Sequence, residues 1–212
     1  MSKVQTKKKP FFKKIGFWIL IVILIIIGAS IGGKGGNSAK NSSNNSISSS
    51  KSSNLLSLAN FDKINLSSTN GDSKANVRKL FGKKESSTSS STIENIKTEL
   101  LTWSNVDNGD IGSNITINFD NDHAVSKSIS GLKVKREKKI SLSDFEAIQN
   151  GQTKDEIKKK FGNPNGYTIT NISGHTSEMW DYTSDIKGEL GANFNISFTN
   201  DQVSGKAQYE MK

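Results

Sequence analysis

The sequence contains no cysteine and only two histidines, His123 and His175. Without cysteine the chain has no disulfide, no thiolate zinc site, no cysteine nucleophile and no lipid-modified N-terminal cysteine. Neither histidine stands in a recognisable catalytic pattern, and His175 lies in a Gly/Ser-rich stretch with no acid or nucleophile assigned to it. We therefore expect no enzymatic activity, no cofactor and no resident metal. An envelope hydrolase that uses one of the two histidines is the alternative from the enzyme class.

Acidic residues are absent from the first 34 residues, which hold seven lysines. The whole chain has 29 basic and 20 acidic residues and a net charge of +9, so 22 basic and 20 acidic residues remain after residue 34. The positive charge therefore belongs mostly to the tail. Because a duplex-binding surface needs a concentrated basic face on the folded part, we expect no nucleic-acid partner.

The longest apolar run extends over 17 residues, from Ile15 to Ile31, and follows six lysines. Seventeen helical residues rise about 25 Å, close to the thickness of a bilayer core. We predict a basic cytoplasmic tail over residues 1–14, a transmembrane signal-anchor over residues 15–33 and an extracytoplasmic C-terminal part, because flanking lysines stay inside. The alternative is a cleaved signal peptide, which would lead to a secreted protein.

Residues 34–54 consist almost entirely of Ser, Asn, Gly and Lys. Such a composition buries too little apolar area to offset chain entropy, so we predict a disordered tether. A coil of this length has an r.m.s. span of about 25 Å. The tether would hold the following domain close to the membrane of a thick-walled, Gram-positive envelope.

One phrase occurs twice, as NGDSKANVRKLFGK in residues 70–83 and as NGQTKDEIKKKFGN in residues 150–163. Similar residues surround both copies in the same order, with a preceding Phe and Ile and a following Trp, and only the loop lengths differ. This is the pattern of a duplicated structural unit. We predict repeat 1 over residues 55–132, a basic linker over residues 133–138 and repeat 2 over residues 139–212.

Each repeat begins with a helical pattern. Ser143 with Glu146 and Thr153 with Glu156 form two S/T-x-x-E capping boxes, each of which predicts the start of a short helix. Gly162 ends the second helix. The repeated phrase is thus a turn, a cap, a short helix and a glycine stop, and folding alone explains it.

Beyond the helices the apolar period changes to two, which predicts strands. ITINF places Ile115, Ile117 and Phe119 on one face, and FNISF in residues 194–198 follows the same rule. The sequences FDND and FTND read as hairpin turns. The predicted class is α+β, in which each repeat has two short helices followed by three or four antiparallel strands. The helices cover the apolar sheet face and leave a face rich in Asn, Thr and Ser free. Whether the two repeats share one sheet stays open.

The pattern resembles a known family. A helix with phenylalanine, then G-x-[ST]-x-x-x-[VI] and FG with a proline soon after, then W-x-Y and a strand ending in F-x-N-D, is similar to the tandem repeats of the beta-lactamase inhibitor protein fold, which is related to SmpA/OmlA-like domains. The resemblance covers everything after the tether and implies a helix-covered sheet whose other face can bind a protein. Repeat 1 departs from the pattern, with FGKKE lacking the proline and WSN replacing W-x-Y. Inhibition of a beta-lactamase is not implied.

Three aromatic residues are candidates for partner contact, namely Trp180, Tyr182 and Tyr209, since such residues dominate interface hot spots. The competing interpretation places Trp180 in the core between sheet and helices.

Two polar clusters are further candidates. Asp120 and Asp122 with His123 could be drawn as a metal site, but Asp-x-Asp in a hairpin is typical of turn chemistry, and we expect no metal there. The segment KVKREKK in residues 133–139 is a solvated linker or, alternatively, a contact for anionic lipid, wall polymer or nucleic acid.

Taken together, these features predict a membrane-anchored, extracytoplasmic protein that binds another protein or a cell-envelope component and catalyses nothing. The histidine hydrolase is one alternative. A prophage-type exclusion factor that acts at the membrane is another.

Overall fold

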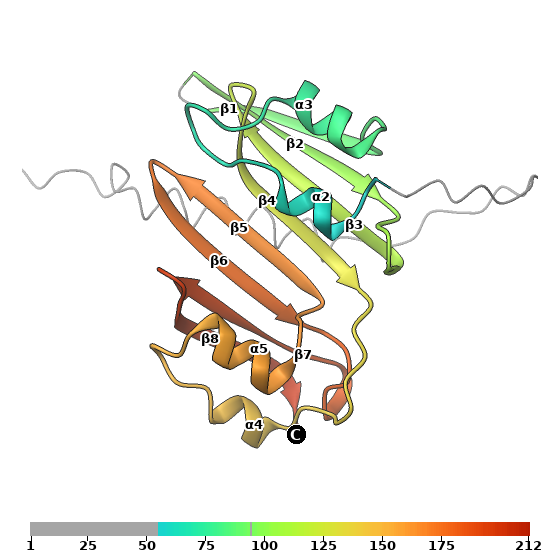
Figure 1. Ribbon diagram of the computed structural model, residues 1–212, viewed down its shortest axis with the longest axis vertical. Helices are drawn as coiled ribbons and strands as arrows, with labels where there is room; N and C mark the ends of the chain where they lie inside the picture. Colours follow the sequence, from blue (N-terminus) through green and yellow to red (C-terminus); the bar gives the residue numbers. More distant parts are fainter. Residues whose placement is uncertain (1–54, 94) are drawn as a thin grey trace, which may run out of the picture. The chain divides into compact units, whose positions relative to one another are not determined.

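The computed structural model describes residues 55–93 and 95–212, which form four short helices and eight strands (Figure 1). The strands make one antiparallel sheet in the order β1 to β8, with each strand beside its neighbour in sequence. The predicted cytoplasmic tail, anchor and tether lie outside the described residues. Within the described part, no helix is long and apolar enough to cross a membrane.

The two halves of the sheet repeat the same element order. The first half contains α2 (Leu58–Asp62), α3 (Lys74–Phe81), β1 (Ser87–Ile93), β2 (Ile96–Ser104), β3 (Gly109–Asp120) and β4 (His123–Leu132). The second half contains α4 (Leu142–Glu146), α5 (Lys154–Phe161), β5 (Gly166–Ile172), β6 (His175–Tyr182), β7 (Gly188–Thr199) and β8 (Gln202–Met211). The predicted α+β class with two helices per repeat is confirmed, and each half has four strands.

The two halves join through the pairing of β4 with β5. Ser126 lies opposite Thr170, and Ile129 lies opposite Tyr167. Tyr167 packs against the apolar core of both halves. The open question is therefore answered by one continuous sheet, and the two repeats do not form independent modules.

All four helices lie on one side of the sheet (Figure 1). Ile115, Ile117 and Phe119 of β3 are buried beneath the first pair, as the alternation predicted. In the second half, Tyr182 stacks on Phe194 with ring centroids 4.5 Å apart.

Helix starts agree with the sequence in one case and differ in another. Thr153 and Glu156 form the predicted capping box of α5. The box predicted from Ser143 and Glu146 is wrong, because α4 begins after Ser141, which forms its box with Asp144. The reason is tertiary: the preceding residue, Ile140, forms a β-bridge with Ile186, so the chain leaves an extended segment at Ser141.

Both predicted hairpin turns are present. The two central residues have positive φ in each turn, with Asn121 at 48° and Asp122 at 70°, and Asn200 at 51° and Asp201 at 61°. Positive φ at both central positions defines a type I′ turn, whose twist suits a two-residue hairpin and which Asn and Asp tolerate best.

A lysine in the last strand of each half holds the first helix of that half. Lys127 Nζ donates to the carbonyl oxygens of Phe61, Asp62 and Ile64 at 3.0, 3.1 and 3.0 Å. In the second half, Lys206 Nζ donates to those of Phe145, Glu146 and Ile148 at 2.9, 2.7 and 2.8 Å. A cation satisfies carbonyls at a helix C-terminus well because it also complements the helix dipole. The duplication thus includes the contact that docks helix on sheet.

The segment between the halves is fixed in place by Arg136. Its guanidinium donates to the carbonyl oxygens of Phe161, Asn163 and Ser184 at 3.1, 2.7 and 3.0 Å. It also lies over the ring of Tyr182, 5.2 Å from the centroid. One residue of the predicted solvated linker is therefore a structural part of the second half.

Candidate binding surface

The sheet face opposite the helices is mostly polar, and Leu100 and Met179 are the apolar residues of its two central rows. Backbone register places one residue from every strand in a single row, which consists of Ser87, Thr102, Thr116, Ser128, Thr168, Met179, Ser197 and Gly205. The adjacent row consists of Ser89, Leu100, Asn118, Ser126, Thr170, Ser177, Thr199 and Gln202. We call these two rows, with the strand residues that alternate with them on the same side, the uncovered face. In the described part of the chain no helix lies on it (Figure 1).

Hydroxyl pairs connect neighbouring strands on this face. Ser126 Oγ and Thr170 Oγ1 are 3.0 Å apart, and Thr168 Oγ1 donates to Ser128 Oγ at 3.1 Å. Both pairs bridge β4 and β5, where the two halves meet. The centre of the uncovered face is therefore an ordered set of short Ser and Thr side chains that satisfy one another, and Ser126, Thr168 and Thr170 are buried there.

Asn118 lies beside these pairs and has an unusual amide. Its Oδ1 is the one buried side-chain polar atom without a hydrogen-bond partner among the described residues. Buried acceptors are nearly always paired in folded proteins, because an unpaired one costs free energy. Asn118 thus carries an unpaired, buried acceptor next to the hydroxyl pairs.

The charge on the uncovered face is low and negative. Asp120 and Asp181 belong to it by register, opposite Thr98 and Asn195 respectively. Burial raises the pKa of Asp181 to about 6, with no opposing effect from a cation. Burial also raises the pKa of Asp120, although a hydrogen bond from Thr98 acts in the other direction. In the central rows given above no residue is basic, so the face suits a partner with hydrogen-bonding rather than strongly charged chemistry.

The three predicted contact residues do not lie together. Trp180 and Tyr182 are buried in the core of the second half, with relative exposures of 5% and 0%. Trp180 Nε1 donates to Glu178, and the Tyr182 hydroxyl donates to the carbonyl oxygen of Gly162 at 3.2 Å. Their alternate positions in β6 point toward the helices, where two apolar rings gain most from burial.

Tyr209 differs from the other two. It lies in β8 opposite Asn193, on the side of the uncovered face, and is 57% exposed. A partner contact through Tyr209 stays a prediction.

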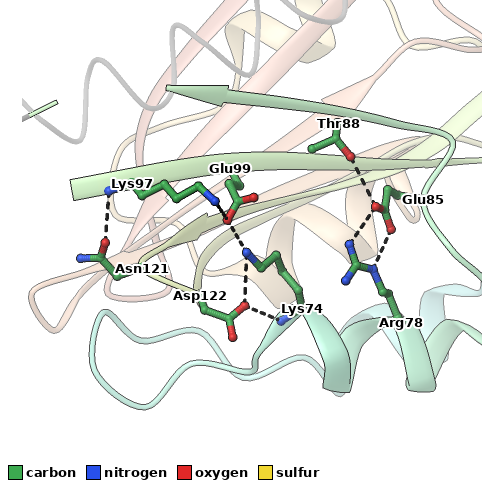
Figure 2. Close-up of polar contacts among 8 residues, drawn as sticks. All are labelled: Lys74, Arg78, Glu85, Thr88, Lys97, Glu99, Asn121 and Asp122. Atoms are coloured by element: carbon green, nitrogen blue, oxygen red, sulfur yellow. Dashed lines mark hydrogen bonds and ion pairs between the residues drawn. The ribbon is translucent and has the colours of Figure 1, made fainter. Parts of the chain in front are cut away.

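The polar cluster considered for metal has a structural explanation, and Figure 2 shows the contacts of its Asp122. Asp122 accepts a hydrogen bond from the backbone N–H of Lys74 at 3.2 Å, and its Oδ1 lies 3.5 Å from Lys74 Nζ. Lys74 Nζ also pairs with Glu99. Asp120 and His123 have other partners, and among the described residues no group of three or more metal-binding side chains converges.

The same arrangement recurs in the second half. Lys154 Nζ donates to Asp201 at 2.7 Å and to Glu178 at 2.5 Å. Asp122 of FDND and Asp201 of FTND therefore fix the first residues of α3 and α5, Lys74 and Lys154, to the sheet. The sequence repeats contained this signal, since a lysine and an aspartate recur at equivalent places in both copies.

A second ion pair fixes the edge strand of the first half (Figure 2). Arg78 donates to both carboxylate oxygens of Glu85 at 2.8 Å. This fork, chiefly through its hydrogen bonds, lowers the pKa of Glu85 to about 2.

The two histidines are the first residues of β4 and of β6. His123 Nδ1 is 3.2 Å from the carbonyl oxygen of Gly71, and His175 Nδ1 is 3.1 Å from that of Ser173. They belong to different halves and face backbone carbonyls.

Comparisons with known proteins agree with this architecture. The model of a family described as a domain of unknown function with a solved structure, DUF3862, matches residues 54–211. The fold is similar to the crystal structure of a "putative beta-lactamase inhibitor protein" from Streptococcus mutans, with a TM-score of 0.56 and 22% sequence identity. That similarity covers 73% of this chain and 95% of the other. No curated protein matches the chain.

Proposed function

Because this chain belongs to the DUF3862 family, whose function is unknown, we propose its function from its own surface: a non-catalytic protein that binds a protein or cell-envelope partner on the uncovered face. The observation that carries this proposal is the row of residues that runs through all eight strands without a basic side chain. Apart from Leu100 and Met179, the residues of the two rows are polar or glycine.

The size of the uncovered face supports a macromolecular partner. Eight strands span about 34 Å at the usual strand spacing, and four residue rows along the strands add about 20 Å. This gives a geometric area of roughly 700 Å², to which the buried central residues Ser126, Thr168 and Thr170 contribute little accessible surface. An ordinary stable interface takes approximately 800 Å² from each partner. A small substrate would need a concave pocket instead.

Several observations support binding without catalysis. The histidines face backbone carbonyls, and the acids near them hold helices or hairpins in place. The similar S. mutans protein is described as a "putative beta-lactamase inhibitor protein", and inhibition of an enzyme by a protein is a binding activity. We extend to this chain only the general idea of protein binding, and not the identity of that protein's target.

The proposed location is the outer face of the cell membrane. The support comes from the sequence, where six lysines precede an apolar run and a Ser/Asn/Gly-rich tether follows it. In this proposal the anchor is retained and the sheet stands within about 25 Å of the bilayer, the r.m.s. reach of the tether. The partner is therefore another component of the membrane or the inner envelope.

The proposal is tested by site-specific photocrosslinking with the full chain expressed in its native host. A photoreactive amino acid replaces Ser197 of β7 in the first row of the uncovered face, or Lys158 on the exposed side of α5 as the matched control. We expect one discrete crosslinked species from position 197 that is absent from position 158.

A second substitution tests whether this row makes the contact. Ser128→Arg places a bulky charge in the same row as Ser197 and should abolish the crosslink, because the row would no longer accept a flat partner. Equal crosslinking from both positions, or a species unaffected by Ser128→Arg, would show that the uncovered face is not the binding surface.

A further inference from the structure

A second repeated motif lies at the start of β3 and of β7. It reads GDIGSN in residues 109–114 and GELGAN in residues 188–193. In both strands the pairing register shifts across the motif, so that four residues oppose a single residue of the next strand. The single residue has positive φ in each case, Gly131 at 74° and Glu210 at 53°. The two bulges therefore have the same backbone arrangement, which occurs once in each repeat.

Each bulge presents one aliphatic side chain to solvent. Ile111 has a relative exposure of 108% and Leu190 of 102%, whereas the other exposed large hydrophobic residues in the described part reach at most 57%. We call Ile111 and Leu190 the tips. Scattered apolar residues on a surface are ordinary, but full exposure at equivalent positions of both repeats needs a reason.

The tips are held in place by their own bulges. The side-chain amide of Asn114 donates to the carbonyl oxygen of Gly112 at 3.2 Å, and that of Asn193 donates to Gly191 at 2.8 Å. Both glycines have a φ of 88°, which L-residues rarely adopt. The backbone therefore keeps the aliphatic side chain pointing outward.

Both tips lie at the same end of the sheet. In an antiparallel meander β3 and β7 run in the same direction, so their first residues share one end. They are four strands apart, which corresponds to about 19 Å. Their flanking charges are balanced, with Lys133 paired to Asp110 and Lys212 paired to Glu189.

The chain enters the folded part at this end too. The backbone N–H of Asp107, in the turn before β3, donates to the carbonyl oxygen of Leu56 at 2.8 Å. Residue 54, where the predicted tether ends, is two positions before Leu56. A domain tethered to a bilayer through this end has its tips on the side from which the tether comes.

We propose that Ile111 and Leu190 insert into the surface of the bilayer that carries the anchor, so that the sheet stands on the membrane by its tip end. This inference rests on the proposed membrane location. Burial of one aliphatic side chain shifts an equilibrium by about tenfold to a hundredfold. Two tips are too weak to hold a free protein on lipid, but a tether raises the effective concentration enough for them to fix its orientation.

Lipid fits these tips better than a protein partner does. A bilayer accepts two isolated aliphatic side chains at any spacing, whereas a protein would need two apolar pockets about 19 Å apart. Because each tip is flanked by a balanced ion pair, docking depends on apolar burial and is insensitive to salt. The uncovered face then stands away from the lipid and remains accessible to its partner.

The absence of native cysteine makes a clean test possible. Full-length chain is reconstituted in phosphatidylcholine–phosphatidylglycerol vesicles after Ile111→Cys or Leu190→Cys and labelling with the fluorophore NBD. Thr176→Cys is the matched control, because it is exposed and lies at the opposite end of the sheet, roughly 30 Å from the tips. We expect blue-shifted emission and quenching by nitroxide-labelled lipid at both tips and neither effect at position 176.

A coupled variant tests the energetics. Ile111→Ser should weaken docking of the label at position 190 by about tenfold to a hundredfold without unfolding the sheet, because Ile111 makes no buried contact. Docking should persist at 1 M salt.

The outcomes separate this inference from the proposals on which it depends. Retention of the chain by vesicles after carbonate washing, with tip labels as exposed as the control, overturns tip docking alone. Tip labels that become protected only when envelope protein is added also overturn it, in favour of a protein contact. Release of the chain by carbonate overturns the anchor and this inference together, while the photocrosslinking test of the uncovered face is unaffected.

Discussion

Replacement of Asp181 by asparagine should stabilise the protein at neutral pH and have little effect in acid. Asp181 lies on the uncovered face between Gly166 and Asn195, and burial raises the pKa of its carboxyl from 3.8 to about 6. The folded state therefore binds the proton more tightly than the unfolded state does. Asp181 costs nothing below pH 4, and its cost grows as the pH rises from about 4 to about 6 and is complete above that range.

The magnitude follows from the shift. A change of about two pKa units corresponds to about 3 kcal/mol, which is the upper limit of the gain in the free energy of unfolding for Asp181→Asn at pH 8. The asparagine is nearly isosteric and carries no charge to desolvate. The contributions of the other carboxyl groups to the pH dependence of stability cancel, because the variant and the parent are compared at each pH.

The assay is urea unfolding of the full chain in mild detergent between pH 4 and pH 8. Fluorescence of the buried Trp103 and Trp180 reports on the core once Trp18 is replaced by phenylalanine. Asp120→Asn is the control and should show a weaker pH dependence, because Thr98 donates a hydrogen bond to its carboxylate. A stability difference for Asp181→Asn that is the same at pH 4 and pH 8 would refute the assignment of a buried, uncompensated carboxylate.

Five further substitutions, in three tests, probe contacts of the fold by the same unfolding assay. Lys127→Met should lower the free energy of unfolding by about 2–4 kcal/mol, because Lys127 is only 6% exposed and its loss leaves buried carbonyl oxygens unpaired. Lys206→Met should lower it by only about 1 kcal/mol, because Lys206 is exposed in the edge strand and water can take the place of its ammonium group. Equal losses would contradict this. Ser141→Ala should lower the free energy of unfolding by about 1 kcal/mol, because it removes the N-cap of α4, and Ser143→Ala should lower it by no more than a few tenths. A larger loss for Ser143→Ala than for Ser141→Ala would show that Ser143 is the helix cap, as the sequence predicted. Gly131→Ala should cost about 1–3 kcal/mol because its φ is 74°, and an unchanged stability would mean that the bulge relaxes.

Duplication in the sequence determined much of the architecture. The repeated phrase, the glycine stop of α5 and the alternation around Ile115 and Phe198 depend on local periodicity, and these local preferences agree with the fold. The hairpin turns are equally local, because Asn and Asp are the residues that tolerate left-handed backbone. These features could be read from one chain without knowledge of its contacts.

Other elements carried too weak a local signal. Strand β1 is STSSSTI, with no apolar alternation, and it forms because β2 offers it hydrogen bonds while Arg78 holds the adjoining Glu85. The start of α4 depends on the bridge between Ile140 and Ile186 rather than on the S-x-x-E capping box that begins at Ser143 in the sequence. In both places a tertiary contact overrode the propensity of the segment.

The candidate surface divides in the same way. Sequence alternation alone predicted a polar sheet face, and the motif GDIGSN/GELGAN was present to be found by the same self-comparison that found the longer phrase. Only the structure decided that Trp180 and Tyr182 face the helices, since an aromatic strand residue gains from burial on whichever side the core lies.

By itself, the sequence determined the duplication, the α+β class and the alternation of each strand, because these depend on residues close together along the chain. The tertiary structure alone decided that β4 pairs with β5. That pairing joins residues about 40 positions apart through backbone hydrogen bonds, to which side-chain identity contributes little. It turns two repeats into one eight-stranded sheet and so brings the polar rows into one surface and both tips to one end.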